Sequence, residues 1–167
     1  VKVGNILIGI ESSGPHSNGF SLIRKIINDS QSPKTLKEDM VKQVLKPTIL
    51  YPNLIMSLIK DFKVNSISHI TGGGLLENLP RSIPNNLSIE IDETSWEIPK
   101  IFQWLKEEGS LSNNEMYRIF NCGIGMALFV EKDDSSKIMN KILQMGHKCF
   151  QIGVVSEKKD NDSIKFF

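Results

Sequence analysis

The chain has 167 residues, of which 40% are hydrophobic and 23% are charged. At this length one hydrophobic core can bury most of the apolar surface, so we expect a single domain over residues 1–167. Twenty basic and nineteen acidic residues leave a formal net charge of +1. Such a balance provides no positive field that would attract nucleic acid.

Two cysteines and three histidines occur without the spacing of a zinc site, so we expect no metal ligands in this chain. No apolar run reaches the roughly 20 residues that cross a bilayer, and the first residues lack the order of a signal peptide. We therefore expect a cytoplasmic protein that binds neither a membrane nor nucleic acid. Val1 opens the chain without a methionine and a strand-like segment follows almost at once, which suggests an excised or processed piece.

Strand patterns and helix patterns alternate along the chain. In chain order we expect a strand at 6–10, helices with apolar stripes beginning at 20, 36 and 54, a strand at 67–70, a short helix from 75, a strand at 87–91, helices after Pro99 and Ser112, a strand at 124–130, a helix through 138–145 and a strand at 150–155. Ser17 or Asn18 is the expected N-cap of the first helix, and Ser112 opens a capping box with Glu115. Residues 164–166 form at most an edge strand. This order predicts an α/β or α+β sheet covered by helices.

The segment 12–19 follows the first strand and precedes a helix. Its glycines free the backbone, its hydroxyls and the Asn18 amide can form hydrogen bonds, and the helix start has unpaired N–H groups. Together these groups can hold an anion. Alternatively, the segment is only a polar turn in which Asn18 caps the helix and His16 points at water.

Three successive glycines, Gly72–Gly74, follow the strand that ends near His69. Close approach of the backbone to a ligand would explain them, although their spacing matches neither a Walker loop nor a GxGxxG fingerprint. The alternative is a tight turn with His69 buried and hydrogen-bonded.

A third segment, 120–126, either lines a pocket or forms a bulge. Its Cys122 has no histidine nearby in sequence that could activate it.

Segments 7–24, 69–81 and 115–126 occur in this order in the phosphoribosylformylglycinamidine cyclo-ligase (aminoimidazole ribonucleotide synthetase) family, and the chain resembles the C-terminal half of that family over nearly its whole length. The resemblance implies a three-layer α/β/α sandwich with a mixed sheet, partly ferredoxin-like. It also implies that an N-terminal half, absent here, holds most of the residues for ATP and Mg²⁺ and forms a homodimer. We expect the isolated chain to be inactive.

The activity implied by the resemblance is ATP-dependent closure of formylglycinamidine ribonucleotide to aminoimidazole ribonucleotide, in purine biosynthesis. His16 and His69 are then the candidate proton carriers, and the expected substrate- or phosphate-binding residues are Ser13, Gly14, Ser17, Asn18, Gly19, Thr71, Gly72, Gly73, Gly74 and Asn78. Because His16 lies in a loop, its loss should cost little folding energy. His69 lies at the end of an expected buried strand, so its loss should affect both folding and activity.

Two other readings remain open. The related ATP-dependent superfamily also contains formylglycinamidine synthetase, selenophosphate synthetase, thiamine-phosphate kinase and a hydrogenase-maturation protein. From a different class, the alternative is a non-catalytic ligand-binding or interaction module. For the cyclo-ligase, the expected partner of this chain is its own N-terminal domain.

Overall fold

Six strands form one mixed sheet in the order β2-β4-β1-β5-β3-β6. The computed structural model describes residues 1–167. The strands are β1 (Ile6–Glu11), β2 (Val64–His69), β3 (Leu87–Ile91), β4 (Ile124–Val130), β5 (Cys149–Glu157) and β6 (Ile164–Phe166). All neighbours are antiparallel except β3 and β6, which are parallel. The expected edge strand at 164–166 is confirmed.

The centre of the sheet is buried on both faces. All seven residues of β4 are buried, and from Met126 to Val130 they alternate between two hydrophobic clusters because successive strand residues point to opposite faces. Ala127 and Phe129 belong to one cluster, whereas Met126, Leu128 and Val130 belong to the other. A strand buried on both faces needs a layer of helices on each side.

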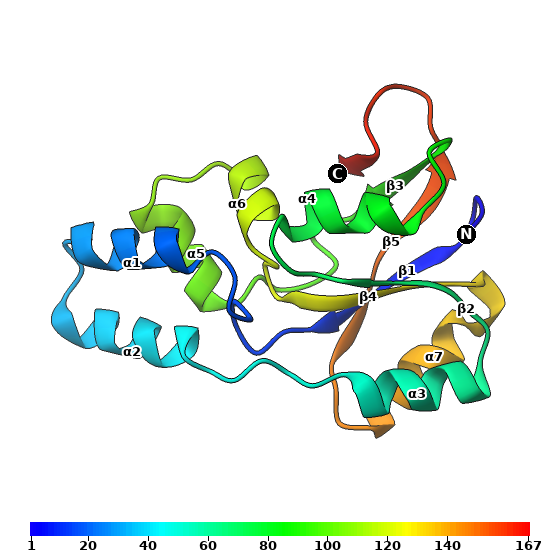
Figure 1. The fold of residues 1–167 in the computed structure, drawn as a ribbon, viewed down its shortest axis with the longest axis horizontal. Helices are drawn as coiled ribbons and strands as arrows, with labels where there is room; N and C mark the ends of the chain where they lie inside the picture. The colour runs from blue at the N-terminus through cyan, green and yellow to red at the C-terminus, as the bar shows by residue number, and fades with distance from the viewer.

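Seven α-helices and one 3₁₀ turn supply these layers. They are α1 (Phe20–Asp29), α2 (Lys34–Val44), α3 (Pro52–Asp61), α4 (Gly74–Asn78), η1 (Leu79–Ser82), α5 (Lys100–Glu108), α6 (Asn113–Ile119) and α7 (Lys132–Gln144). The sheet lies between α4 on one side and α3 and α7 on the other (Figure 1). The expected α/β fold, a mixed sheet covered by helices, is confirmed.

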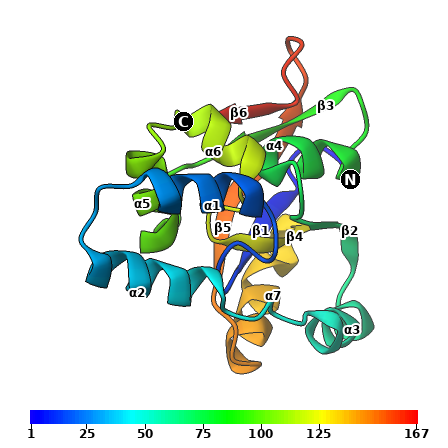
Figure 2. The ribbon, with the colours of Figure 1, turned by 60° about the vertical axis from the view of Figure 1, so that its left-hand side comes forward.

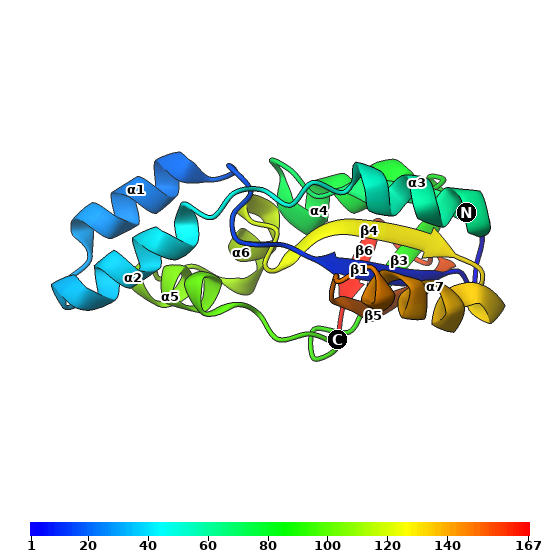
Figure 3. The same cartoon turned by 90° about the horizontal axis from the view of Figure 1, so that it is seen from below.

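Helices α1 and α2 form a hairpin beside α5, beyond one end of the sheet (Figure 2). Figure 3, seen from below, shows that this helical extension continues the long axis of the molecule away from α3 and α7. None of the helices has the length and apolar character that crossing a bilayer requires.

Two local expectations about helix starts had opposite outcomes. The capping box is confirmed, because the Ser112 hydroxyl accepts from the Glu115 N–H at 3.3 Å and the Glu115 carboxylate accepts from the Ser112 N–H at 2.9 Å. The expected cap of α1 was wrong: Gly19, with a φ of 72°, occupies the N-cap position without a side-chain bond. The Asn18 amide turns instead to the carbonyl of His16, at 2.8 Å.

Candidate functional site

The three glycine-containing segments meet at one end of the sheet. Strand β4 lies between β2 and β1 and is antiparallel to both, so its start lies where the other two strands end. The Ser12 N–H donates to the Gly123 carbonyl at 2.8 Å, and the Ile70 N–H donates to the Gly125 carbonyl at 3.0 Å. We define the candidate site as this cluster of segments 12–19, 69–78 and 121–125.

Asn121 joins the first and third segments. Its side chain is 1% exposed, and its Oδ1 accepts from the Ser12 hydroxyl and from the Gly123 N–H, both at 2.9 Å. Its Nδ2 donates to the Gly14 carbonyl at 2.8 Å. Because a buried amide is costly unless it is paired, these bonds hold the first loop in one position against the start of β4.

His16 lies inside the first loop and not at its surface. Only 5% of it is exposed, with a φ of 50°. Its Nε2 accepts from the Ser13 N–H at 3.0 Å and lies 3.4 Å from the Ile49 N–H, so the ring proton is assigned to Nδ1. Nδ1 is buried without a partner, and a Cβ at Gly125 would lie 3.1 Å from it.

This burial fixes the charge of His16. Desolvation, followed by the nearby charge of His69, lowers the pKa of His16 to about 4, because burial disfavours the charged imidazole. His16 is therefore neutral at pH 7, with both ring nitrogens enclosed. The alternative in which His16 points at water is therefore wrong, because the loop folds back over its own side chain. That the loss of His16 costs little folding energy stays a prediction.

His69 shows the opposite correction. It is exposed at the end of the outermost strand β2, and the next residue, Ile70, is fully buried. Successive side chains of a strand point to opposite faces of the sheet. Ile70 therefore points into the hydrophobic core, and the imidazole of His69 points to the opposite face, where it stays exposed. The alternative of a tight turn with a buried His69 is therefore wrong, and of the two histidines His69 is the one that a ligand can reach.

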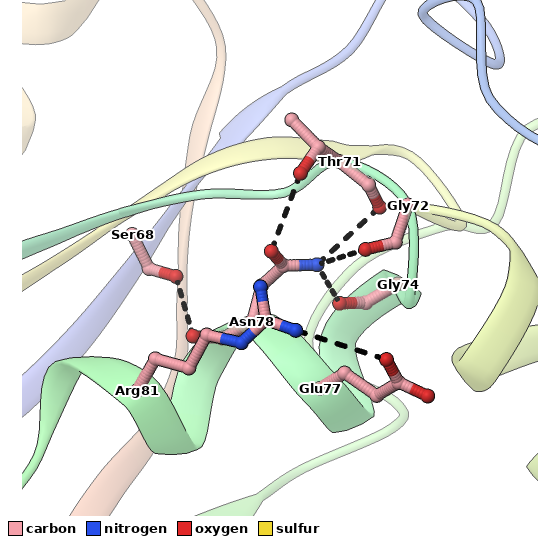
Figure 4. A network of polar contacts seen from close by, with 7 residues as sticks. All are labelled: Ser68, Thr71, Gly72, Gly74, Glu77, Asn78 and Arg81. Carbon is pink, nitrogen blue, oxygen red and sulfur yellow. Dashed lines mark hydrogen bonds and ion pairs between the residues drawn. The ribbon is translucent and has the colours of Figure 1, made fainter.

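Asn78 organises the glycine loop from within. Its Nδ2 donates to the carbonyls of Thr71, Gly72 and Gly74 at 3.3, 3.1 and 2.8 Å, and its Oδ1 accepts from the Thr71 hydroxyl at 3.3 Å. Figure 4 shows this amide pointing into the loop. The side chains of Thr71 and Asn78, both expected at the ligand, are thus already engaged in holding the backbone.

Packing explains part of the glycine run. A Cβ on Gly74 would collide with the carbonyl of Tyr117 and lie 2.6 Å from that of Phe120, so α4 can approach α6 only through a glycine. Gly72 is different: it is exposed, and a Cβ there would meet only the Asn18 Oδ1, at 3.6 Å. The two loops are therefore neighbours, with Gly72 facing Asn18.

The groups still available to a ligand lie between these two loops. Ser17 is exposed, and Asn18 and Gly19 are half-buried. Two other expected residues are not available: the Ser13 hydroxyl donates a hydrogen bond to the Pro47 carbonyl at 2.6 Å, and Gly14 is buried. The first N–H groups of α1 have no partner within their helix. These N–H groups, with Ser17, the Asn18 Oδ1 and Gly72, form a polar surface that can bind an anion.

Other parts of the molecule offer different chemistry. No three His, Cys, Asp or Glu side chains lie close enough together to hold a metal ion. Burial raises the pKa of the Cys122 thiol to about 12, so this residue cannot supply a thiolate near pH 7. Two cavities, of about 510 Å³ between α5 and α6 and of about 530 Å³ between α4, α6 and β6, share Glu93, Asn113 and Tyr117 and contain none of the histidines.

Residues 2–165 match the protein family described as "AIR synthase related protein, C-terminal domain". The chain belongs to this family. Among curated relatives, phosphoribosylformylglycinamidine cyclo-ligases are 44% identical in Lawsonia intracellularis and 39% in Neisseria meningitidis serogroup B, each over 97% of this chain and 48% of the relative. That of Citrifermentans bemidjiense is 44% identical over 94% of this chain and 47% of the relative. The chain thus spans about half the length of these relatives.

Solved structures agree on the fold of this family member. The hydrogenase maturation protein HypE of E. coli superposes with a TM-score of 0.66 at 18% identity, over 99% of this chain and 46% of that one. Thiamine-monophosphate kinase of Stenotrophomonas maltophilia gives 0.62 at 14% identity, over 99% and 50%. At such identities the likeness establishes the architecture alone.

Sequence reasoning missed two residues of this site. Asn121 was visible as a lone amide between apolar neighbours, a pattern that often marks a buried hydrogen-bonded group. Tyr51 gave no signal beyond its position before Pro52. It is 3% exposed, and its ring lies 6.1 Å from that of His16 and 6.3 Å from that of His69, measured between centroids.

Proposed function

We propose that this chain is the C-terminal half of an ATP-dependent cyclo-ligase that converts formylglycinamidine ribonucleotide to aminoimidazole ribonucleotide. The observation that carries the proposal is the convergence of segments 12–19, 69–78 and 121–125 in a family member 39–44% identical to named cyclo-ligases. The fold relatives among kinases and maturation proteins are only 11–18% identical, which favours the cyclo-ligase over those activities.

The reaction transfers the terminal phosphoryl group of ATP to the formyl-amide oxygen. An amidine nitrogen then attacks the activated carbon, a C–N bond forms, the C–O bond breaks, and phosphate leaves with the oxygen. The nitrogen loses one proton, and the products are aminoimidazole ribonucleotide, ADP and phosphate. This chemistry needs a proton acceptor and fixed donors around phosphoryl oxygens.

We assign the proton transfer to His69, because it is exposed at the site while both ring nitrogens of His16 are enclosed. His16 supports the first loop from within and could exchange a proton with a substrate only if that loop opened. The donors for phosphoryl oxygens are the first N–H groups of α1, Ser17 and the backbone at Gly72. The side chain of Asn78 and the backbone of Gly73 and Gly74 keep that segment in place.

The remaining parts of the proposal lie outside this chain. No cluster here fits Mg²⁺, so we derive no step through a metal ion and place ATP and Mg²⁺ mainly in an N-terminal half. We also propose that the full-length enzyme is a cytoplasmic homodimer through that half. These assignments follow from the likeness to the cyclo-ligases.

The direct test compares the complete protein with the 167-residue chain. Each is incubated with ATP, Mg²⁺ and formylglycinamidine ribonucleotide, and ADP and aminoimidazole ribonucleotide are quantified by mass spectrometry. We expect equal amounts of the two products from the complete protein and neither from the chain alone. Release of ADP without ring closure by the complete protein would refute the proposed reaction. Turnover by the chain alone would refute the proposal that ATP binds mainly in an N-terminal half.

A further inference from the structure

Tyr51 lies between the two histidines of the candidate site. It is the residue before α3, and its ring packs in the hydrophobic cluster formed by β1, β4, α3 and α7. The ring planes of Tyr51 and His69 meet at 71°, an edge-to-face contact, and those of Tyr51 and His16 at 55°. His147 is a third neighbour, at 6.4 Å between centroids. Tyr51 therefore contacts both a buried neutral histidine and an exposed one.

The Tyr51 hydroxyl is bound to the end of β1. Its Oη donates to the carbonyl of Glu11 at 2.6 Å. Glu11 is the last residue of β1, and the pairing of β1 with β4 shifts register between Ile10 and Glu11. Because the first loop of the site begins at Ser12, this bond fixes the point from which the loop leaves the sheet.

Gly125 makes room for this arrangement. A Cβ at Gly125 would collide with the Tyr51 hydroxyl and would lie 2.8 Å from Cε1 of His16. The tyrosine and the histidine thus fill the space over a strand residue without a side chain, which leaves the tyrosine ring no freedom to tilt toward β4. Burial, together with the charge of Glu11, raises the pKa of Tyr51 far above its ordinary value, so the phenol donates a hydrogen bond and carries no proton to a substrate.

We propose that Tyr51 is a positioning residue of this site, whose ring orients the imidazole of His69 and whose hydroxyl holds the start of the first loop. The inference rests on the proposed function, because it assigns Tyr51 an effect on catalysis that passes through His69. It separates the two parts of one side chain: the ring acts on the proton carrier, and the hydroxyl acts on the anion-binding loop.

The contacts are tested first by NMR on the chain itself. Tyr51→Phe keeps the ring and removes the hydroxyl, so the Ser12 amide, which shares a peptide group with the Glu11 carbonyl, should shift while the ring protons of His69 stay in place. Tyr51→Leu also removes the aromatic ring current, so the ring protons of His69 should move too. Tyr117→Phe changes the only other tyrosine and should affect neither signal. Unmoved His69 signals in Tyr51→Leu would overturn the proposal.

The role is tested by kinetics on the complete protein. A small misplacement of a catalytic group can cost up to about 10²-fold in rate, so Tyr51→Leu should lower kcat by roughly 10- to 10²-fold while KM changes by less than about twofold. In a His69→Ala background, Tyr51→Leu should cause no loss beyond that of Tyr51→Phe, because the effect of the ring passes through the missing imidazole. In the protein with His69 intact, Tyr51→Phe, which keeps the ring, should retain most of the kcat of the parent.

The outcomes separate this inference from the proposed function. If the parent protein closes the imidazole ring but Tyr51→Leu lowers kcat below that of Tyr51→Phe by the same factor with and without His69, the tyrosine ring does not act through His69 and the inference fails alone. If the parent protein does not close the ring, the proposed function fails, and the catalytic role of Tyr51 fails with it. If the effect of the Tyr51 ring on kcat disappears in the His69→Ala background and the NMR shifts are as expected, the proposed function and the role of Tyr51 are both supported.

Discussion

The side-chain amide of Asn121 donates a 2.8 Å hydrogen bond to the carbonyl of Gly14, 107 positions earlier in the sequence. The same amide accepts from Ser12 and Gly123. One buried side chain therefore joins the loop after β1 to the turn before β4.

Replacing Asn121 by alanine should lower the free energy of unfolding by about 3 kcal/mol. The substitution leaves the Gly14 carbonyl, the Gly123 N–H and the Ser12 hydroxyl unpaired, and each buried unpaired group costs about 1–3 kcal/mol. Urea unfolding followed by circular dichroism measures the change. Asn140→Ala is the matched control: Asn140 is exposed on α7, so this variant should stay within about 0.5 kcal/mol of the parent. Equal losses in both variants would contradict the prediction.

The stability of the parent chain should depend on His16 between about pH 4 and 6.5. The pKa of His16 is lowered to about 4 in the folded state from 6.5, so in this window the unfolded state binds more protons and acidification favours unfolding. The contribution is complete above the unfolded pKa and is lost as the pH falls. Between pH 7 and pH 4 the parent should lose up to about 3 kcal/mol more than His16→Asn, whose side chain does not titrate.

Urea midpoints of the parent and of His16→Asn, measured at pH 4, 5, 6 and 7, test this expectation. Other groups titrate equally in both proteins, so the difference between the two curves isolates His16. Parallel curves over this range would show that His16 is protonated with equal ease in the folded and unfolded states.

Gly125→Ala should destabilise the chain by about 1–3 kcal/mol, the usual cost of overpacking. The new methyl group would collide with the Tyr51 hydroxyl, so adding Tyr51→Phe should recover part of the loss. Recovery should be incomplete because Cε1 of His16 remains 2.8 Å away. Gly72→Ala, which enters open space near Asn18, serves as control and should cost much less. The melting temperatures of the single and double variants measure this recovery. If Tyr51→Phe recovers none of the loss, the Tyr51 hydroxyl does not lie over Gly125.

Inorganic phosphate should bind weakly between the first two loops. The N-terminus of α1 contributes only about 0.3–1 kcal/mol to anion binding at an exposed position, and salt screens it. An NMR titration should therefore shift the amides of 20–22 and of Gly72 at millimolar phosphate, and added sodium chloride should reverse the shifts. If phosphate moves neither group of amides, the anion surface between the loops does not exist.

Much of the fold could be predicted from local patterns. The apolar run at 124–130 is a strand buried on both faces, and Ser112 with Glu115 forms the expected box, because both depend on neighbours in the chain. The start of α1 could not be predicted, because Asn18, a good capping residue, is engaged by the His16 carbonyl in a loop shaped by Asn121.

The segments that form the candidate site could be predicted from the sequence, but the solvent exposure of its histidines could not. The alternatives with His16 pointing at water and with His69 buried are both wrong. A loop residue becomes buried only when its loop folds over it, which here depends on distant partners such as Ile49 and Gly125. The exposure of His69 depends on β2 being the outermost strand, and strand order is not visible in a hydrophobic pattern.

The order of the strands also affects how this chain must fold during its synthesis. Strand β1 is made early but pairs only with β4 and β5, and the bond between Glu11 and the Lys148 N–H spans 137 positions. At about 5–20 residues per second, a ribosome needs roughly 7 to 30 seconds to cover that distance. For most of this interval, until β4 is complete at Val130, the apolar segment Ile6–Ile10 has no strand to pair with, so it is exposed to aggregation and is a natural binding target for chaperones on the nascent chain.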